Sequence, residues 1–198
     1  MAYALNPLPA PVGVYPQYTS DKTETLVLKE KIVSLPGDSF DVLLADGRPL
    51  LKVKAKVLSV GARRSVFDAA SGTHLFDIYR DLMHVHTTYV LEDPSGNKFF
   101  ELRNNIRFLS TSATAHFATK ATGKPEALTM RGSWNNLRGD IKDDTGHVVA
   151  RIDRQLLNAR ELVFHQSSYA VVVAPGMDMA IVAAMCICLD DKAKMQYN

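Results

Sequence analysis

The stretch PGMDMAIVAAMCICLDD, residues 175–191, carries the signal that decides the fold. Between residues 177 and 189, Asp178 is the only charged residue, and at about 100° per residue the apolar side chains leave no polar side. A helix that is apolar all round must be surrounded by protein or by lipid. Thirteen residues span only about 20 Å, whereas a bilayer core needs about 30 Å. The stretch therefore predicts a helix over residues 177–190 that the rest of the chain encloses.

The side chains of this predicted helix supply the core that we expect for the domain: Met179, Ile181, Val182, Met185, Cys186 and Leu189. The chain has two cysteines, Cys186 and Cys188, both within the helix. Two residues apart, they point about 200° away from each other, so they can neither pair nor bind one metal ion together. They are expected to act as small buried hydrophobes in a reducing compartment, which predicts an intracellular, cytoplasmic protein.

Composition sets broad limits on the class of protein. With 198 residues, 46% apolar and 22% charged, the chain has the usual make-up of one soluble globular domain. A net charge of +2 does not favour nucleic acid as a partner. The N-terminal residues lack a basic segment followed by an apolar run, so no secretory signal is expected. We expect a monomer without metal or other cofactor.

A repeat of turn glycines dominates the middle of the chain. Successive glycines are separated by 25, 24, 27 and 23 residues: Gly47, Gly72, Gly96, Gly123 and Gly146. Each follows a small polar residue or Asp and lies between runs of alternating apolar and polar residues, which is typical of a β-hairpin. Five hairpins give ten strands, and the runs at 24–33 and 169–173 bring the prediction to twelve.

These strands are predicted to have one buried face. Within residues 51–57, four apolar residues alternate with three lysines. A long antiparallel meander of this kind can close on itself and so remove its edges. About twelve strands form a barrel too wide to be filled by its own side chains, and the apolar helix supplies the filling. The predicted fold class is mainly β: a closed antiparallel barrel of about twelve strands around a central hydrophobic C-terminal α-helix.

The domain boundaries follow from this arrangement. We expect one barrel domain over residues 21–192, a proline-rich arm over 1–20 and a tail over 193–198. Residues 155–168 show neither strand nor turn character and are predicted to form a loop with one helical turn at most. The arm either moves freely or packs against the barrel through Val14, Tyr15 and Tyr18.

Several segments together resemble the LURP-one-related family, in its fungal branch: PVGVYPQY, TETLVLKEK, GDSFDV, HLFDIYRD, RGSW, VVARIDRQ and VAPGMDMAIVAAMCICLDD. The resemblance covers about residues 11–192. It implies the fold of the tubby C-terminal domain, a barrel around a helix, with a remote similarity to phospholipid scramblases. The resemblance also implies a role in defence-type signalling, with which the plant members are associated. No enzymatic activity is established for the family. Tubby domains bind phosphoinositides through surface Lys and Arg, but no such position can be matched to a residue of this chain.

Catalytic and metal-binding motifs do not stand out. The sequence contains no G-x-S-x-G, H-E-x-x-H, P-loop or G-x-G-x-x-G motif, so no enzyme is expected. His84 and His86 are spaced to share one strand face, but the spacing supplies no third ligand. Asp140, Asp143 and Asp144 surround a turn glycine, which favours a turn over a catalytic or Ca²⁺ site.

One cluster of charges stands above the background. We name it the basic strip; its members are Lys52, Lys54, Lys56, Arg63 and Arg64. Such a strip suits an anionic membrane surface or phosphoinositide headgroups. It equally suits a solvated strand face whose lysines deter edge pairing.

Two hypotheses for the function follow. In the first, the protein is a non-catalytic module that binds anionic lipid or a protein partner in signalling, peripheral at a membrane if lipid is the ligand. In the second, it is a scramblase-like membrane protein that acts on phospholipids through its apolar helix. Helix length favours the first hypothesis, because thirteen apolar residues followed by Asp190 and Asp191 suit a barrel interior better than a bilayer.

Overall fold

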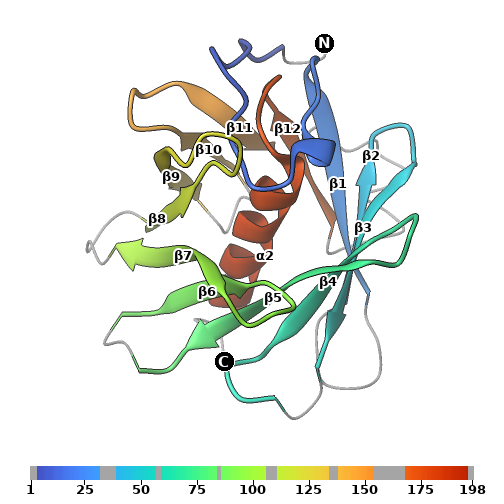
Figure 1. Ribbon diagram of the computed structural model, residues 1–198, viewed down its shortest axis with the longest axis vertical. Helices are drawn as coiled ribbons and strands as arrows, with labels where there is room; N and C mark the ends of the chain where they lie inside the picture. The colour runs from blue at the N-terminus through green and yellow to red at the C-terminus, as the bar shows by residue number, and fades with distance from the viewer. Residues whose placement is uncertain are drawn as a thin grey trace.

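The computed structural model describes residues 4–31, 39–56, 59–83, 86–105, 111–133, 138–153 and 168–195 (Figure 1). In these ranges the chain forms a short 3₁₀ helix, η1 (Pro16–Tyr18), twelve strands and one α-helix, α2 (Met179–Met195). The strands are β1 (Glu24–Lys31), β2 (Ser39–Leu44), β3 (Pro49–Ala55), β4 (Arg64–Asp68), β5 (His74–Asp81), β6 (Thr88–Glu92), β7 (Lys98–Asn105), β8 (Thr111–Ala118), β9 (Pro125–Ser133), β10 (Arg138–Lys142), β11 (Val148–Asp153) and β12 (Ser168–Val173).

The strands form one closed antiparallel barrel. Each strand pairs with the next along the chain, and β1 pairs with β12 to close the sheet, from Glu24 opposite Val173 to Lys29 opposite Ser168. Closure removes the exposed edges that an open sheet of this length would present. The predicted fold class, a twelve-stranded antiparallel barrel with a C-terminal helix, is therefore confirmed.

The hairpin turns lie where the sequence predicts them. The five turn glycines have φ values between 68° and 88°, a conformation that side chains bearing a Cβ rarely adopt. Because the strands run up and down, all five turns lie at the same end of the barrel. That end also holds the N-terminal arm and the start of α2: Lys120, in one of these turns, donates a backbone hydrogen bond to Gly13 in the arm.

Helix α2 runs through the barrel (Figure 1). The six residues expected to form the core are at most 6% exposed, and the helix is buried on every side as far as Leu189. It begins at Met179, two residues later than predicted, because Met177 and Asp178 are in β-bridges to the arm. It ends at Met195, beyond the predicted residue 190, since no helix-breaking residue follows the buried part.

Asp178 joins the arm to the helix. Its Oδ1 accepts hydrogen bonds from the backbone N–H groups of Ala180 at 2.8 Å and Ile181 at 3.3 Å, which caps the helix. Its Oδ2 accepts from those of Val14 at 2.9 Å and Tyr15 at 2.7 Å, which are in the arm. One buried carboxylate therefore holds both segments.

The arm packs against the end of the barrel. Tyr18 is 4% exposed and donates a hydrogen bond to Asp68 at 2.6 Å, while the Tyr15 hydroxyl donates to the carbonyl of Leu75 at 3.0 Å. At Gly13, an added Cβ would lie 2.1 Å from the Cβ of Asp178, so the close approach requires glycine. Of the two alternatives for the arm, the described residues show the packed one.

Some of the sequence-based predictions fall outside the described ranges. These include the strand position Val57, the histidine His84, residues 32–33 of the run at 24–33, the predicted loop at 155–168 up to residue 167, and the predicted tail from residue 196. The last residue of that loop, Ser168, begins β12.

The charge of Asp178 should make stability depend on pH. Burial raises the pKa of this carboxyl from 3.8 to about 6, even though four backbone N–H groups donate to it. A pKa raised in the folded state means that the contribution of Asp178 to stability is fully present below about pH 4 and is lost as pH rises through about 6. Chemical unfolding of the wild type and of Asp178→Asn should therefore show that the wild type loses stability relative to the variant between these pH values. A relative gain over the same interval would contradict this, because it would mean that the N–H donors outweigh burial.

Candidate functional site

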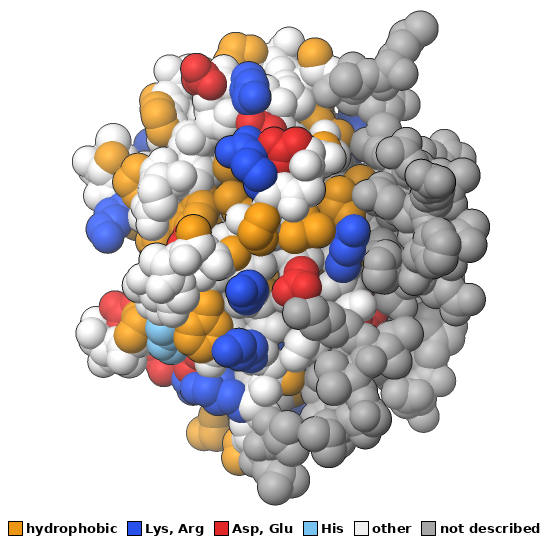
Figure 2. Space-filling model, turned by 90° about the vertical axis from the view of Figure 1, so that its right-hand side faces the viewer, with side chains coloured by type: hydrophobic (Ala, Val, Ile, Leu, Met, Phe, Trp, Pro, Cys, Tyr) orange, Lys and Arg blue, Asp and Glu red, His pale blue; other side chains and the backbone are white. Residues whose placement is uncertain are grey.

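The outer face of β3 carries the only part of the basic strip that is free of carboxylate partners in the described ranges. Lys52 and Lys54 are exposed and alternate with the buried residues Leu51 and Val53. Neither lysine forms an ion pair with a described residue. Figure 2 shows this side of the barrel, where Lys and Arg side chains follow one another next to hydrophobic and acidic ones.

Two other members of the basic strip are neutralised by neighbours. The Nζ of Lys56 lies 3.0 Å from Oδ2 of Asp77. Arg63 lies 2.9 Å from the same oxygen and 3.1 Å from Oε1 of Glu92, and its guanidinium stacks 4.4 Å from the ring centroid of Tyr79. Their charges are thus balanced by carboxylates of β5 and β6, so they add little to the attraction of an external anion.

Asp77 is the centre of this ion-pair network. Its side chain is 8% exposed and also accepts a hydrogen bond from the Ser65 hydroxyl at 2.6 Å and contacts Nε2 of His74 at 2.9 Å. Burial alone would raise the pKa of Asp77, but the hydrogen bonds from Ser65, Arg63, Lys56 and His74 hold it well below 3.8. A carboxylate so fully hydrogen-bonded is a poor proton acceptor, which gives the network a structural role.

Arg64 does not belong to the outer surface. It is 5% exposed and lies on the same side of β4 as the core residue Val66, opposite Ala55 of β3. The outward positions of β4 are held by Ser65 and Phe67 instead, because side chains alternate along a strand. The sequence predicts Arg64 on the surface, and this prediction is wrong. Of two adjacent strand residues, one faces inward, but the pair Arg63–Arg64 does not indicate which one.

The same barrel wall ends in an exposed apolar cluster that the sequence did not indicate. Among the described residues, the exposed large hydrophobic side chains are Val60 at 82%, Leu82 at 56% and Met83 at 92%. We name these three residues the apolar tip. They lie in the β3–β4 and β5–β6 connections, at the end of the barrel opposite the tight turns.

The two connections of the apolar tip are held against each other. The backbone N–H of Arg80 donates to the carbonyl of Gly61 at 2.8 Å. At Gly61, an added Cβ would lie 2.4 Å from the carbonyl oxygen of Arg80, so this contact requires glycine. The only signal for the tip in the sequence is that apolar residues adjoin Gly61 and follow Asp81, at positions where connections between strands are predicted.

Two further kinds of candidate are the metal-binding groups and the cysteines. In the described part of the chain, no group of three or more His, Cys, Asp or Glu residues is placed to hold a metal ion. Cys186 and Cys188 are buried, and burial raises the pKa of the Cys186 thiol, which disfavours the reactive thiolate. No described helix has the length and apolarity needed to cross a membrane.

Comparison with known proteins places the chain in a family. Residues 24–190 match the family described as LURP-one-related. The chain is 21% identical over 188 residues to Protein LURP-one-related 1 of Arabidopsis thaliana, covering 92% of this chain and 84% of that protein. It is 22% identical over 186 residues to Protein LURP-one-related 15 of the same plant, covering 91% and 85%.

A solved structure shares the fold. The X-ray structure of an Arabidopsis thaliana protein matches with a TM-score of 0.59 at 16% identity, covering 93% of this chain and 99% of that one. Because the family match covers most of the barrel, the chain belongs to the LURP-one-related family.

Proposed function

We propose that the protein is a non-catalytic binding module that attaches to anionic lipid surfaces, with the apolar tip entering the headgroup region. The observation that carries this is the tip itself: Val60, Leu82 and Met83 gather at one end of the barrel. Exposed apolar residues scattered singly are ordinary, but a group in adjacent loops favours an interaction site.

Charge on the adjoining wall supports a lipid surface as the ligand. Lys52 and Lys54 have no carboxylate partner among the described residues, and each basic residue near an anionic surface contributes about 1 kcal/mol. The Nζ of Lys54 lies 5.1 Å from the ring centroid of Phe67, and this contact keeps the ammonium group on the outer face. Two such charges and a shallow apolar insertion together give reversible attachment.

Two alternatives fit the geometry less well. Scramblase-like action through α2 requires the apolar helix to meet lipid, yet the barrel surrounds it as far as Leu189. Docking of the apolar tip onto a protein partner uses the same three side chains but gives no role to Lys52 and Lys54. The ion pairs with Lys56 and Arg63 occupy the buried carboxylate of Asp77 on this wall, which supports a non-catalytic role.

The apolar tip can be tested by replacing Leu82 and Met83 with Ser. Both are exposed, so the fold should persist, as checked by thermal unfolding. Fully burying one such side chain contributes about 1.5–3 kcal/mol, so vesicle affinity should fall by at least about tenfold even with shallow insertion. Co-sedimentation with phosphatidylserine vesicles measures this. Unchanged binding by the variant would remove the tip from the interface.

The two lysines make a separate prediction. The variant Lys52→Gln with Lys54→Gln should bind anionic vesicles roughly thirtyfold less tightly at low salt, since two charges of about 1 kcal/mol each are lost. Its control is Lys120→Gln, an exposed lysine at the tight-turn end of the barrel that forms no ion pair with a described residue. Wild-type protein that ignores anionic vesicles at low salt would contradict the lipid proposal. An equal loss in the control would show a general effect of charge.

A further inference from the structure

A groove lies on the outer face of β9, β10 and β11. On the ribbon these strands are on the side of the barrel away from β2–β4, so the groove is separate from the apolar tip and the lysines of β3 (Figure 1). Its volume is about 800 Å³, within the range of small-molecule sites.

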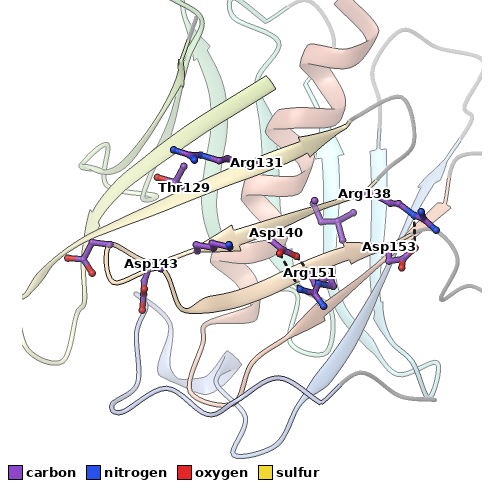
Figure 3. A pocket seen from close by; sticks show the side chains of 12 residues that line it. Thr129, Arg131, Arg138, Asp140, Asp143, Arg151 and Asp153 are labelled. Carbon is purple, nitrogen blue, oxygen red and sulfur yellow. Dashed lines mark hydrogen bonds and ion pairs between the residues drawn. The ribbon is translucent and has the colours of Figure 1, made fainter. Parts of the chain in front are cut away.

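Most charged side chains of the groove are already paired. Arg151 donates to both carboxylate oxygens of Asp140, at 2.7 and 3.2 Å, and Arg138 lies 3.6 Å from Asp153 (Figure 3). A further carboxylate, that of Asp143, accepts hydrogen bonds from its own turn, including one from the Thr145 hydroxyl at 2.7 Å. The two Arg–Asp pairs leave those four groups little net charge, whereas Asp143 is hydrogen-bonded by neutral donors and keeps its negative charge.

Two cations in the groove have no such partner. Arg131 of β9 and Lys142 of β10 are exposed, and neither forms an ion pair with a described residue. Lys142 lies opposite Thr129, and Arg131 lies opposite Asp140, so the two cations are diagonal neighbours, about 7–8 Å apart at the backbone. Both heads can reach one anion between them.

A hydroxyl completes this set of donors. Thr129 projects from the same side of β9 as Arg131 (Figure 3), and its Oγ1 lies 3.3 Å from that of Thr114 on β8. Guanidinium, ammonium and hydroxyl groups are together the donors that bind phosphate, with Arg able to make two parallel hydrogen bonds. A phosphate monoester carries about −1.5 to −2 at pH 7, which matches the two cations.

The carboxylates of the groove define the rest of the ligand. Ionised carboxylates only accept hydrogen bonds, so Asp140 and the exposed Asp144 favour a ligand with hydroxyl groups. The negative charge of Asp144, which has no ion-pair partner among the described residues, opposes a second phosphate. We infer that the groove binds the phosphate monoester of a polyhydroxylated small molecule, with the phosphate on Arg131, Lys142 and Thr129 and the hydroxyls toward Asp140 and Asp144.

Calorimetric titration at constant ionic strength tests this with glucose 6-phosphate, inorganic phosphate and fructose 1,6-bisphosphate. The monoester should bind about tenfold more tightly than inorganic phosphate and more tightly than the bisphosphate. Arg131→Gln and Lys142→Gln should each weaken monoester binding by about tenfold or more, because each removes one of two cations. The exposed Lys120→Gln serves as the matched control and should change binding by less than about twofold.

Three results would overturn the inference. The first is no saturable binding of the monoester at about 10 mM. The second is tighter binding of the bisphosphate, which would indicate general charge attraction. The third is binding only to vesicles that carry phosphatidylinositol 4-phosphate, which would make the ligand a lipid headgroup.

The membrane proposal is tested independently of this one. Arg131→Gln should keep vesicle binding that depends on the apolar tip, and Lys52→Gln with Lys54→Gln should keep binding of the soluble monoester. Failure of one proposal therefore leaves the other standing.

Discussion

Enclosure of an apolar helix by a closed sheet is the constraint on which the rest of the structure depends. Helix α2 is buried on all sides as far as Leu189, and twelve strands pair all round it. A barrel of this width cannot be filled by its own side chains, and an all-apolar helix cannot remain in water, so neither element is stable without the other. The buried carboxylate of Asp178 fixes the start of the helix and ties the arm over it.

This mutual dependence explains why the fold could be predicted from the sequence. Strand alternation, turn glycines and helix length are local patterns, and each is set by backbone geometry: at Gly47, for example, the turn needs a φ of 87°. The helix boundaries were less accurate, because the bridge from Val12 to Met177 depends on a segment more than 160 residues away in the chain.

The candidate sites were harder to predict because they depend on contacts between strands. Spacing alone gave five basic residues, but Asp77 on β5 neutralises two of them and Arg64 is buried. The apolar tip involves two connections that a backbone hydrogen bond from Arg80 to Gly61 links, and the groove involves residues of three strands. The Asp cluster near Gly146 is predicted to form a turn, and Asp143 accepts hydrogen bonds from that turn, whereas Asp140 pairs with Arg151 of the neighbouring strand. All three aspartates of the cluster line the groove.

Thiol accessibility measures the enclosure of α2 most directly. Cys186 and Cys188 are the two cysteines of the chain, and both are buried within the barrel. In native protein at neutral pH, a thiol reagent such as dithionitrobenzoate should react with neither cysteine except at the rate of unfolding, and in denaturant it should react with both. Prompt reaction of either thiol in the native protein, well below the denaturation midpoint, would contradict enclosure of the helix.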